Sequence, residues 1–181
     1  MESESDWEER IRAMRMEKDD FFGSSRRSPI PADERQSFDG LNYFEPNPDY
    51  RYELKLDEFD DKSVVEIGTT EEGERKYLDW GVFSFTVDGE DCELHAYKSD
   101  PDESRLWVPF RDETNGDETY GAGRYLDLDE DSHRLDDDRW ILDFNQAYNP
   151  FCVYSDDYEC ALIPTTNWLD VSIEAGEKSY K

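Results

Sequence analysis

Apolar and polar residues alternate along most of the middle of the chain, between residues 50 and 144. A period of two is typical of β-strands that bury one face. No segment with a helical period interrupts this region, so we expect an antiparallel β core there. The predicted strands cover residues 51–56, 63–67, 77–87, 105–110, 120–128 and 139–144.

One hairpin is predicted in register. Asp88–Gly89 supplies a two-residue turn between two alternating runs. With that turn, Phe85 lies opposite Cys92 and Phe83 lies opposite Leu94. Apolar residues then face apolar residues, so the turn and the hydrophobic pattern agree.

A second hairpin is predicted over residues 105–128, with its turn at Asn115–Gly116. In that register Gly121 and Gly123 face Phe110 and Val108, which cover the missing side chains. The polar turn region also fits a longer loop.

Residues 5–22 are predicted to form a helix, because apolar positions recur there at steps of three and four. Ser5 with Glu8 forms a capping box, and Gly23 is a natural stop. The helix is charged on its other face and should pack on a larger body. The stripe consists of Trp7, Ile11, Met14, Lys18 and Phe21 or Phe22.

The two ends of the chain complete the predicted architecture. Residues 24–31 are a connector, and residues 32–38 allow one more short helical turn. Residues 145–181 are aromatic, Asn-rich and irregular, with a possible last strand at 169–173. The expected fold is mainly β in one domain, residues 1–181, an antiparallel β-barrel or sandwich of about seven to eight strands with the N-terminal helix packed outside.

The charge composition changes the picture of the solvent. Lys and Arg number 20 and Asp and Glu number 48, giving a net charge of −28. Only seven of the basic residues are Lys, and the carboxylates spread from Glu2 to Glu177. The pattern predicts adaptation to molar salt, where a Debye length of about 3 Å screens the repulsion. Aromatic residues make up 14% of the chain, which indicates a folded domain and not a disordered acidic chain.

The same charge argues against several partners. A strongly negative chain repels nucleic acid and anionic membranes, and the only basic run is Arg26–Arg27. The sequence shows neither a membrane span nor a signal peptide, so we expect a cytoplasmic protein. The oligomeric state is not indicated.

No cofactor or metal motif is recognisable. Three cysteines, Cys92, Cys152 and Cys160, are too few and too odd in number for a disulfide framework, so free thiols are expected. Neither they nor His95 and His133 have the spacing of a zinc site. No glycine-rich phosphate loop or nucleophile elbow is present.

Candidate ligand-binding residues come from polar groups in apolar surroundings. Arg124 lies in an apolar strand and needs an anionic partner, and Asp143 lies within the last predicted strand. If residues 128–138 form a hairpin turn, the two meet, either as a structural ion pair or as part of a site for a small polar ligand. The remaining candidates are Asn145, Tyr148, Asn149, Tyr154, Glu177 and Lys178.

Several long motifs resemble one known family. They include FDGLNYF (38–44), VPFRDET (108–114), LDFNQAYNPFCVYSDDYECAL (142–162) and AGEKSY (175–180). The chain resembles the family catalogued as domain of unknown function 1684 (DUF1684), haloarchaeal members included, from about residue 17 to the end. The family tends to have Cys-Pro-Leu-Pro-Pro where this chain has residues 160–164 as CALIP. The resemblance implies no activity and no catalytic residues.

Three functional hypotheses follow. The first is a non-catalytic, cytoplasmic module that binds a small molecule. The second is a hydrolase or isomerase that takes its acid–base pair from Asp143, Tyr154, Glu177 or His95. The third is a structural or interaction protein. A polar cavity favours the first two, and a solid core favours the third.

Overall fold

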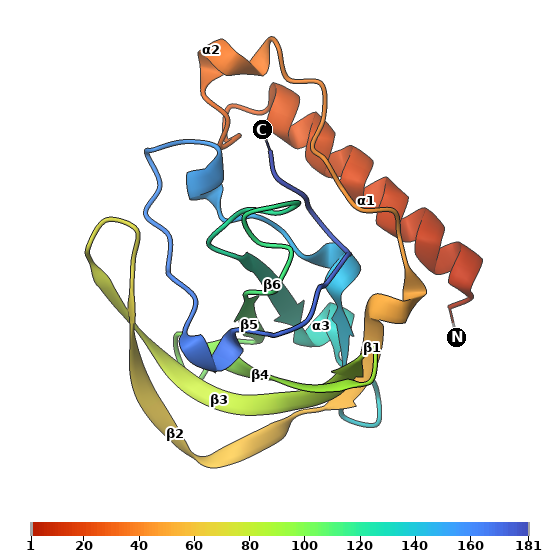
Figure 1. The fold of residues 1–181 in the computed structure, drawn as a ribbon, viewed down its shortest axis with the longest axis vertical. Coiled ribbons are helices and arrows are strands. Elements are labelled where there is room, and N and C mark those ends of the chain that lie inside the picture. The colour runs from red at the N-terminus through yellow and green to blue at the C-terminus, as the bar shows by residue number, and fades with distance from the viewer. Residues whose placement is uncertain (1, 181) are drawn as a thin grey trace.

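The computed structural model describes residues 2–180, which form seven strands in two antiparallel sheets together with an N-terminal helix (Figure 1). The larger sheet has the order β2-β3-β4-β5-β6, and β1 pairs with β7 in the smaller one. The mainly β prediction is confirmed, but no closed barrel is formed within residues 2–180, where β2 and β6 are the outer strands of their sheet. The strands are β1 (Arg51–Lys55), β2 (Asp57–Gly68), β3 (Glu74–Val87), β4 (Glu90–Lys98), β5 (Arg105–Phe110), β6 (Arg124–Asp129) and β7 (Arg139–Asp143).

The β3–β4 hairpin has the predicted register. Phe85 lies opposite Cys92 and Phe83 opposite Leu94. Asp88 and Gly89 have φ of 49° and 84°, the left-handed values that a tight turn of this type requires. The apolar face of this hairpin forms part of the main hydrophobic core, to which β5, β6, β7 and residues between 144 and 175 also contribute.

The β5–β6 hairpin is confirmed, but its predicted register is wrong. Phe110 lies opposite Arg124 and Val108 opposite Leu126. The loop is longer than a tight turn, because hydrogen bonds of Asp112 to Thr114 and Asn115, and of these two residues to Thr119, hold residues 112–119 in a loop. Gly123, with φ of 103°, therefore lies before the strand and not within it.

Helix α1 (Glu4–Ser24) begins and ends differently from the prediction. Ser3 is the N-cap, and its hydroxyl accepts the Asp6 amide hydrogen at 3.1 Å, so the Ser5 capping box is wrong. The helix continues through Gly23, because Ser25 and not the glycine forms its C-cap. Of the expected stripe, Trp7, Ile11 and Phe22 are buried, whereas Met14 and Phe21 are exposed.

Helix α1 lies at the opposite end of the molecule from the long strands β2 and β3 (Figure 1). We call residues 145–180 the closing segment. Its last part, drawn in dark blue, runs between α1 and these strands. Phe22 packs in a second, smaller core with Ile30 and Tyr154. The short helical elements are α2 (Ala32–Arg35), α3 (Glu130–His133), η1 (Pro48–Tyr50), η2 (Phe144–Gln146), η3 (Phe151–Val153) and η4 (Thr165–Asn167).

The expected last strand at residues 169–173 is wrong. This segment bends at residues 170 and 171 and is not part of a ladder. It is held by single hydrogen bonds to the loop after β5: Leu169 donates its amide hydrogen to the Arg111 carbonyl at 2.8 Å, and Glu113 donates to Val171 at 2.9 Å. The rest of the segment beyond β7 contains only short helical turns and isolated bridges within the described residues.

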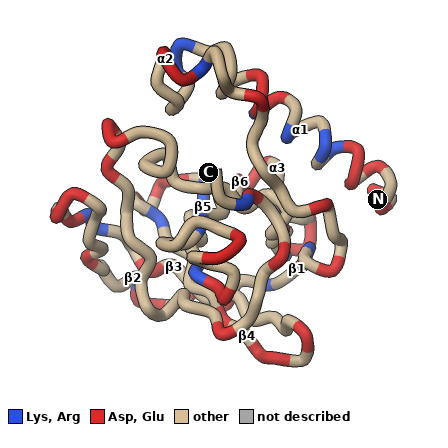
Figure 2. Tube along the Cα trace, turned by 45° about the horizontal axis from the view of Figure 1, so that its top comes forward, with Lys and Arg blue, Asp and Glu red and all other residues tan. Residues whose placement is uncertain are grey.

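Asp and Glu positions occur throughout the trace and are not gathered in one tail (Figure 2). Lys and Arg are fewer, and several of them lie along α1. Within residues 2–180, no helix combines the length and the apolar character needed to cross a membrane.

Candidate functional site

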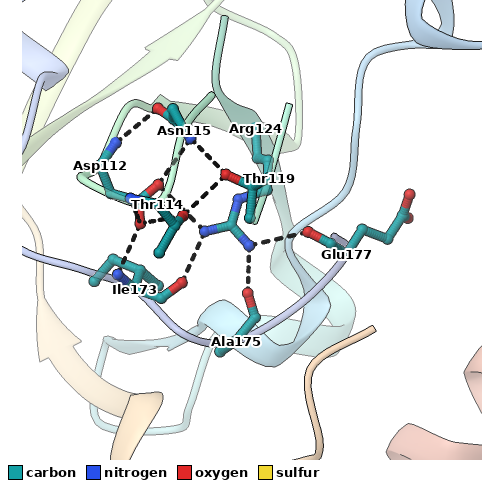
Figure 3. A network of polar contacts seen from close by, with 8 residues as sticks. All are labelled: Asp112, Thr114, Asn115, Thr119, Arg124, Ile173, Ala175 and Glu177. Carbon is teal, nitrogen blue, oxygen red and sulfur yellow. Dashed lines mark hydrogen bonds and ion pairs between the residues drawn. The ribbon is translucent and has the colours of Figure 1, made fainter. Parts of the chain in front are cut away.

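Arg124 at the start of β6 is completely buried and binds the closing segment (Figure 3). Its guanidinium donates to the backbone carbonyls of Ile173 at 2.9 Å and Glu177 at 3.2 Å, and to that of Ala175. Its Nη2 lies 3.4 Å from Oδ1 of Asp112. Burial lowers the pKa of Arg124, and the Asp112 charge opposes that shift.

Asp112 is held by donors from two segments. Its Oδ2 accepts hydrogen bonds from the Thr114 hydroxyl and the Ile173 amide, both at 2.7 Å, and its Oδ1 accepts one from Asn115 Nδ2 at 2.9 Å. The Arg124–Asp112 pair therefore joins the β5–β6 loop, β6 and residues 173–177. The Asp112 carboxylate and both Nη atoms of Arg124 are bound by protein groups, which supports a structural role for Arg124. Arg124 Nε has no hydrogen-bond partner among the described residues.

The predicted pairing of Arg124 with Asp143 is wrong. Asp143 accepts hydrogen bonds from Trp7 Nε1 at 2.7 Å and from Asn145 Nδ2 at 2.8 Å. The reason is topological: residues 128–138 do not connect a hairpin, because β6 pairs with β5 and β7 pairs with β1. Asp143 thus anchors α1 to the smaller sheet.

Four other predicted residues, Asn149, Tyr154, Glu177 and Lys178, do come together around the buried carboxylate of Glu177. One oxygen of this carboxylate accepts hydrogen bonds from the Tyr154 hydroxyl at 2.6 Å and from the backbone amide of Asn149 at 3.4 Å. The other oxygen forms an ion pair with Lys18 of α1. Asn149 Nδ2 donates to the Lys178 carbonyl at 3.0 Å. Burial raises the pKa of Tyr154. The cluster ties the closing segment to α1.

The four residues proposed as acid–base candidates are not gathered in one place. Tyr154 and Glu177 bond to each other, whereas Asp143 holds α1. His95 Nδ1 lies 2.9 Å from Oδ1 of Asp79 on the neighbouring strand. Each carboxylate is already engaged by protein groups.

Tyr148 lies in a cleft of about 390 Å³ between the larger sheet and residues 148–161, which we call the aromatic cleft. Its sheet wall is the face of β5 and β6 opposite the core, since Trp107 and Tyr125 alternate with buried Val108 and Leu126. The lining residues are Arg75, Tyr77, Ser99, Glu103, Arg105, Trp107, Tyr125, Asp127, Tyr148, Pro150, Phe151, Tyr158, Glu159, Cys160 and Ala161.

The aromatic rings of the cleft form a continuous row. Tyr77 stacks on Trp107 with centroids 4.8 Å apart, and Trp107 meets Tyr125 edge-on at 5.1 Å. Tyr125 in turn meets Tyr148 at 5.8 Å and 89°. Such rings offer a large, stiff apolar surface with polar tips.

Asp127 is the polar group beside this row. The Tyr148 hydroxyl donates to its Oδ2 at 2.6 Å, and Arg105 lies 3.9 Å away. Burial raises the pKa of Asp127, while the hydrogen bond from Tyr148 and the charge of Arg105 partly counteract the rise. Burial and the neighbouring carboxylate also raise the pKa of Tyr148.

A smaller cavity of about 230 Å³ lies under α1, on the other side of Tyr148 and Asp127. The predicted residues Asn145 and Glu177 line it. The buried Tyr43 hydroxyl and Arg15 Nε, also in its lining, have no hydrogen-bond partner among the described residues. This cavity is small for a metabolite.

No group of three or more His, Cys, Asp or Glu side chains within residues 2–180 is arranged to hold a metal ion.

One comparison with known proteins identifies a family. The family model described as "Protein of unknown function (DUF1684)" matches residues 36–178. The chain belongs to this family. The resemblance noted in the sequence is therefore confirmed.

One similar solved structure is the solution NMR structure of an uncharacterized protein of Haloarcula marismortui, with 46% sequence identity and a TM-score of 0.73. The match covers 96% of this chain and 95% of that one. No curated protein matches this chain. The similar structure supports the fold, and neither the family description nor this structure names an activity.

Proposed function

We propose that this protein is a non-catalytic module that binds a small organic molecule in the aromatic cleft. The observation that carries the proposal is the Asp127–Tyr148 hydrogen bond at the side of a row of aromatic rings. Apolar walls with a few convergent polar groups are typical of ligand sites, and the volume of about 390 Å³ lies within the usual range of such sites. Of the predicted site residues, only Tyr148 belongs to this cleft.

The groups in the cleft favour a ligand with an apolar or planar body and a positive charge or hydrogen-bond donor. The lining contains three carboxylates and two arginines. The carboxylates are Asp127, Glu103 and Glu159, and the arginines are Arg75 and Arg105. One of these arginines, Arg105, lies near two of the carboxylates, 3.6 Å from Glu103 and 3.9 Å from Asp127. Aromatic faces next to a carboxylate attract organic cations.

Native mass spectrometry of protein purified from its own cytoplasm tests this proposal. We expect a retained small organic molecule, and a Trp107→Ala variant should lose it because the row of rings is broken. Trp168→Ala is the matched control, since Trp168 is exposed and lies outside the cleft.

A titration with benzylamine, followed by amide chemical shifts in molar KCl, provides an independent readout. Shifts confined to the cleft in the wild type, absent in Trp107→Ala, support the proposal. A protein that retains nothing and shows no cleft shifts with benzylamine would contradict it.

One observation favours a second candidate, an enzyme that transfers protons. The raised pKa of Asp127 beside a tyrosine hydroxyl is suited to acid–base chemistry. If the retained molecule is converted by the wild type but only bound by Asp127→Asn, the enzyme interpretation replaces the binding module.

We further propose that the protein works in a salt-rich cytoplasm as one module of residues 1–181, without a nucleic acid or membrane partner. The net charge of −28 and the 46% identical haloarchaeal structure support this setting. The dependence of the thermal midpoint on the KCl concentration tests the salt-rich setting.

A further inference from the structure

Two cysteines lie close together beside the aromatic cleft, and one of them lines it. Cys160 lines the cleft next to Arg75, and Cys152 belongs to the short helical turn η3. The Cys152 amide donates a hydrogen bond to Cys160 Sγ at 3.3 Å. The Cys160 sulfur thus lies against the backbone of Cys152, eight positions earlier in the sequence.

Cys160 is held in place by its backbone. Its amide donates to the Thr70 hydroxyl at 3.2 Å, and its carbonyl accepts the Thr70 amide hydrogen at 3.0 Å. The backbone of Cys160 is therefore fixed at the cleft wall by contacts to the turn after β2, and its sulfur accepts the Cys152 amide hydrogen.

The surroundings of Cys160 favour its thiolate. The neighbouring Cys152 side chain, the hydrogen bond from the Cys152 amide and the positive charge of Arg75 lower the pKa of Cys160 to about 6, although the chain as a whole is strongly acidic. The neighbouring Cys160 side chain and burial raise the pKa of Cys152. One thiolate next to one thiol is the arrangement of an attacking and a resolving cysteine.

We propose that Cys160 is a thiol-modification site that reacts with low-molecular-weight disulfides entering the aromatic cleft, and that Cys152 resolves the adduct. The Cys160 thiolate attacks one sulfur of the disulfide RSSR, so that a Cys160–SR bond forms and RS⁻ leaves. Cys152 then loses its proton to solvent and attacks Cys160 Sγ, forming the Cys152–Cys160 disulfide and expelling the second RS⁻. Overall, two protein thiols are oxidised and one RSSR is reduced to two thiols.

Cys92 is the internal control for this chemistry. It is buried in the main core, and burial raises its pKa. All three cysteines are free in the structure, which corresponds to the reduced state. The proposal does not depend on the ligand of the cleft, because a thiol pair reacts whether or not another molecule binds there.

Intact-mass analysis of the reduced protein treated with cystamine in molar KCl tests the proposal. The wild type should end with the loss of two hydrogen atoms and no retained adduct. Cys152→Ser should stop at one cystamine half bound to Cys160, as peptide mapping shows. Cys160→Ser should acquire no adduct on the same timescale, and Cys92→Ser should behave as the wild type.

The pH dependence of alkylation gives a second readout. In the wild type, iodoacetamide should label Cys160 with a half-maximal rate near pH 6, well below the range of an ordinary thiol. Circular dichroism of each variant verifies that it is folded. First reaction at Cys92 or Cys152, equal alkylation rates at the three thiols, or a stable adduct on the wild type would each overturn the proposal.

Discussion

Arg124, Asp143 and Glu177 are charged residues with almost no exposed surface, and each joins segments that are distant in sequence. Arg124 holds residues 173–177, Asp143 holds Trp7, and Glu177 holds Lys18. Removing one partner of such a pair leaves a charge buried without compensation. At the scale of single residues, these three positions should therefore dominate the response to mutation.

The Arg124→Met variant should lower the free energy of unfolding by about 3–5 kcal/mol, because Asp112 loses its cationic partner. In a double-mutant cycle, Arg124→Met with Asp112→Leu should show a coupling energy of about 1–3 kcal/mol. Denaturant unfolding in molar KCl measures all four proteins.

The control is a second double-mutant cycle, in which Arg124→Met is combined with a substitution of Asp143 in place of the substitution of Asp112. Arg124 and Asp143 have different partners, so their effects should add within about 0.5 kcal/mol. Strong coupling in the Asp143 cycle, with none in the Asp112 cycle, is incompatible with the network described here.

Asp127 should make stability depend on pH. Its pKa is raised in the folded state, so the native protein binds more protons than the unfolded chain. Its contribution is complete below the unfolded pKa of about 3.9 and is lost as the pH rises through the folded pKa. Comparison of wild-type and Asp127→Asn unfolding curves should show the variant gaining relative stability over that window.

NMR titration of the Asp127 carboxyl group measures its pKa in the folded protein directly. In Tyr148→Phe the pKa of Asp127 should rise further, because the hydrogen bond that favours the charged carboxylate is gone. An unchanged or lower pKa in that variant is the contrary outcome.

At the scale of elements, α1 is attached by contacts at both of its ends. Trp7 is buried near the start and donates to Asp143, and Phe22 is buried near the end in the smaller core. Between them, Arg15 donates to the Phe44 carbonyl at 2.7 Å. The helix is therefore fixed by a few specific residues and not by a continuous apolar stripe.

Trp7→Phe tests this attachment while preserving most of the apolar contact. We expect a loss of about 2 kcal/mol, the usual range for a hydrogen bond to a charged group. Met16→Ala on the same helix is the matched control, since Met16 is largely exposed and its replacement should change the unfolding free energy by less than about 0.5 kcal/mol. Equal effects of the two substitutions contradict the role assigned to Trp7.

Elements with local signals were predictable from the sequence. The Asp88–Gly89 turn and the alternation on both sides of it determine the β3–β4 register, because turn geometry and burial agree there. The β5–β6 register was not predictable, since the loop conformation depends on Asp112 and its distant partner Ile173. The pairing of β7 with β1 was not predictable either, because the two strands are far apart in the sequence.

The candidate site was only partly predictable for the same reason. Buried polar residues stand out in an apolar pattern, and Arg124, Asp143 and Glu177 are indeed buried, but their partners come from other segments. The aromatic cleft did leave a signal that the sequence analysis missed: Trp107 and Tyr125 occupy the strand positions that alternate with core residues. Aromatic residues on a nominally exposed sheet face indicate that something covers them.

At the scale of the whole molecule, repulsion among carboxylates opposes the compact state. The net charge is −28, and screening weakens as salt is removed. We therefore expect the thermal midpoint to fall steeply when KCl is reduced from molar to millimolar concentration, as followed by near-UV circular dichroism. A midpoint that stays constant across the series would remove the support for a salt-rich setting.

The placement of residues 173–177 has a consequence for the order of assembly during synthesis. Ribosomes deliver the chain from its N-terminus, so the β5–β6 hairpin emerges well before the carbonyl groups that accept from Arg124. Until then this guanidinium must stay hydrated, and Glu177 is not available to engage Lys18 of α1. Nascent chains halted before residue 173 should consequently remain sensitive to proteases, with protection appearing only after this segment has left the exit tunnel.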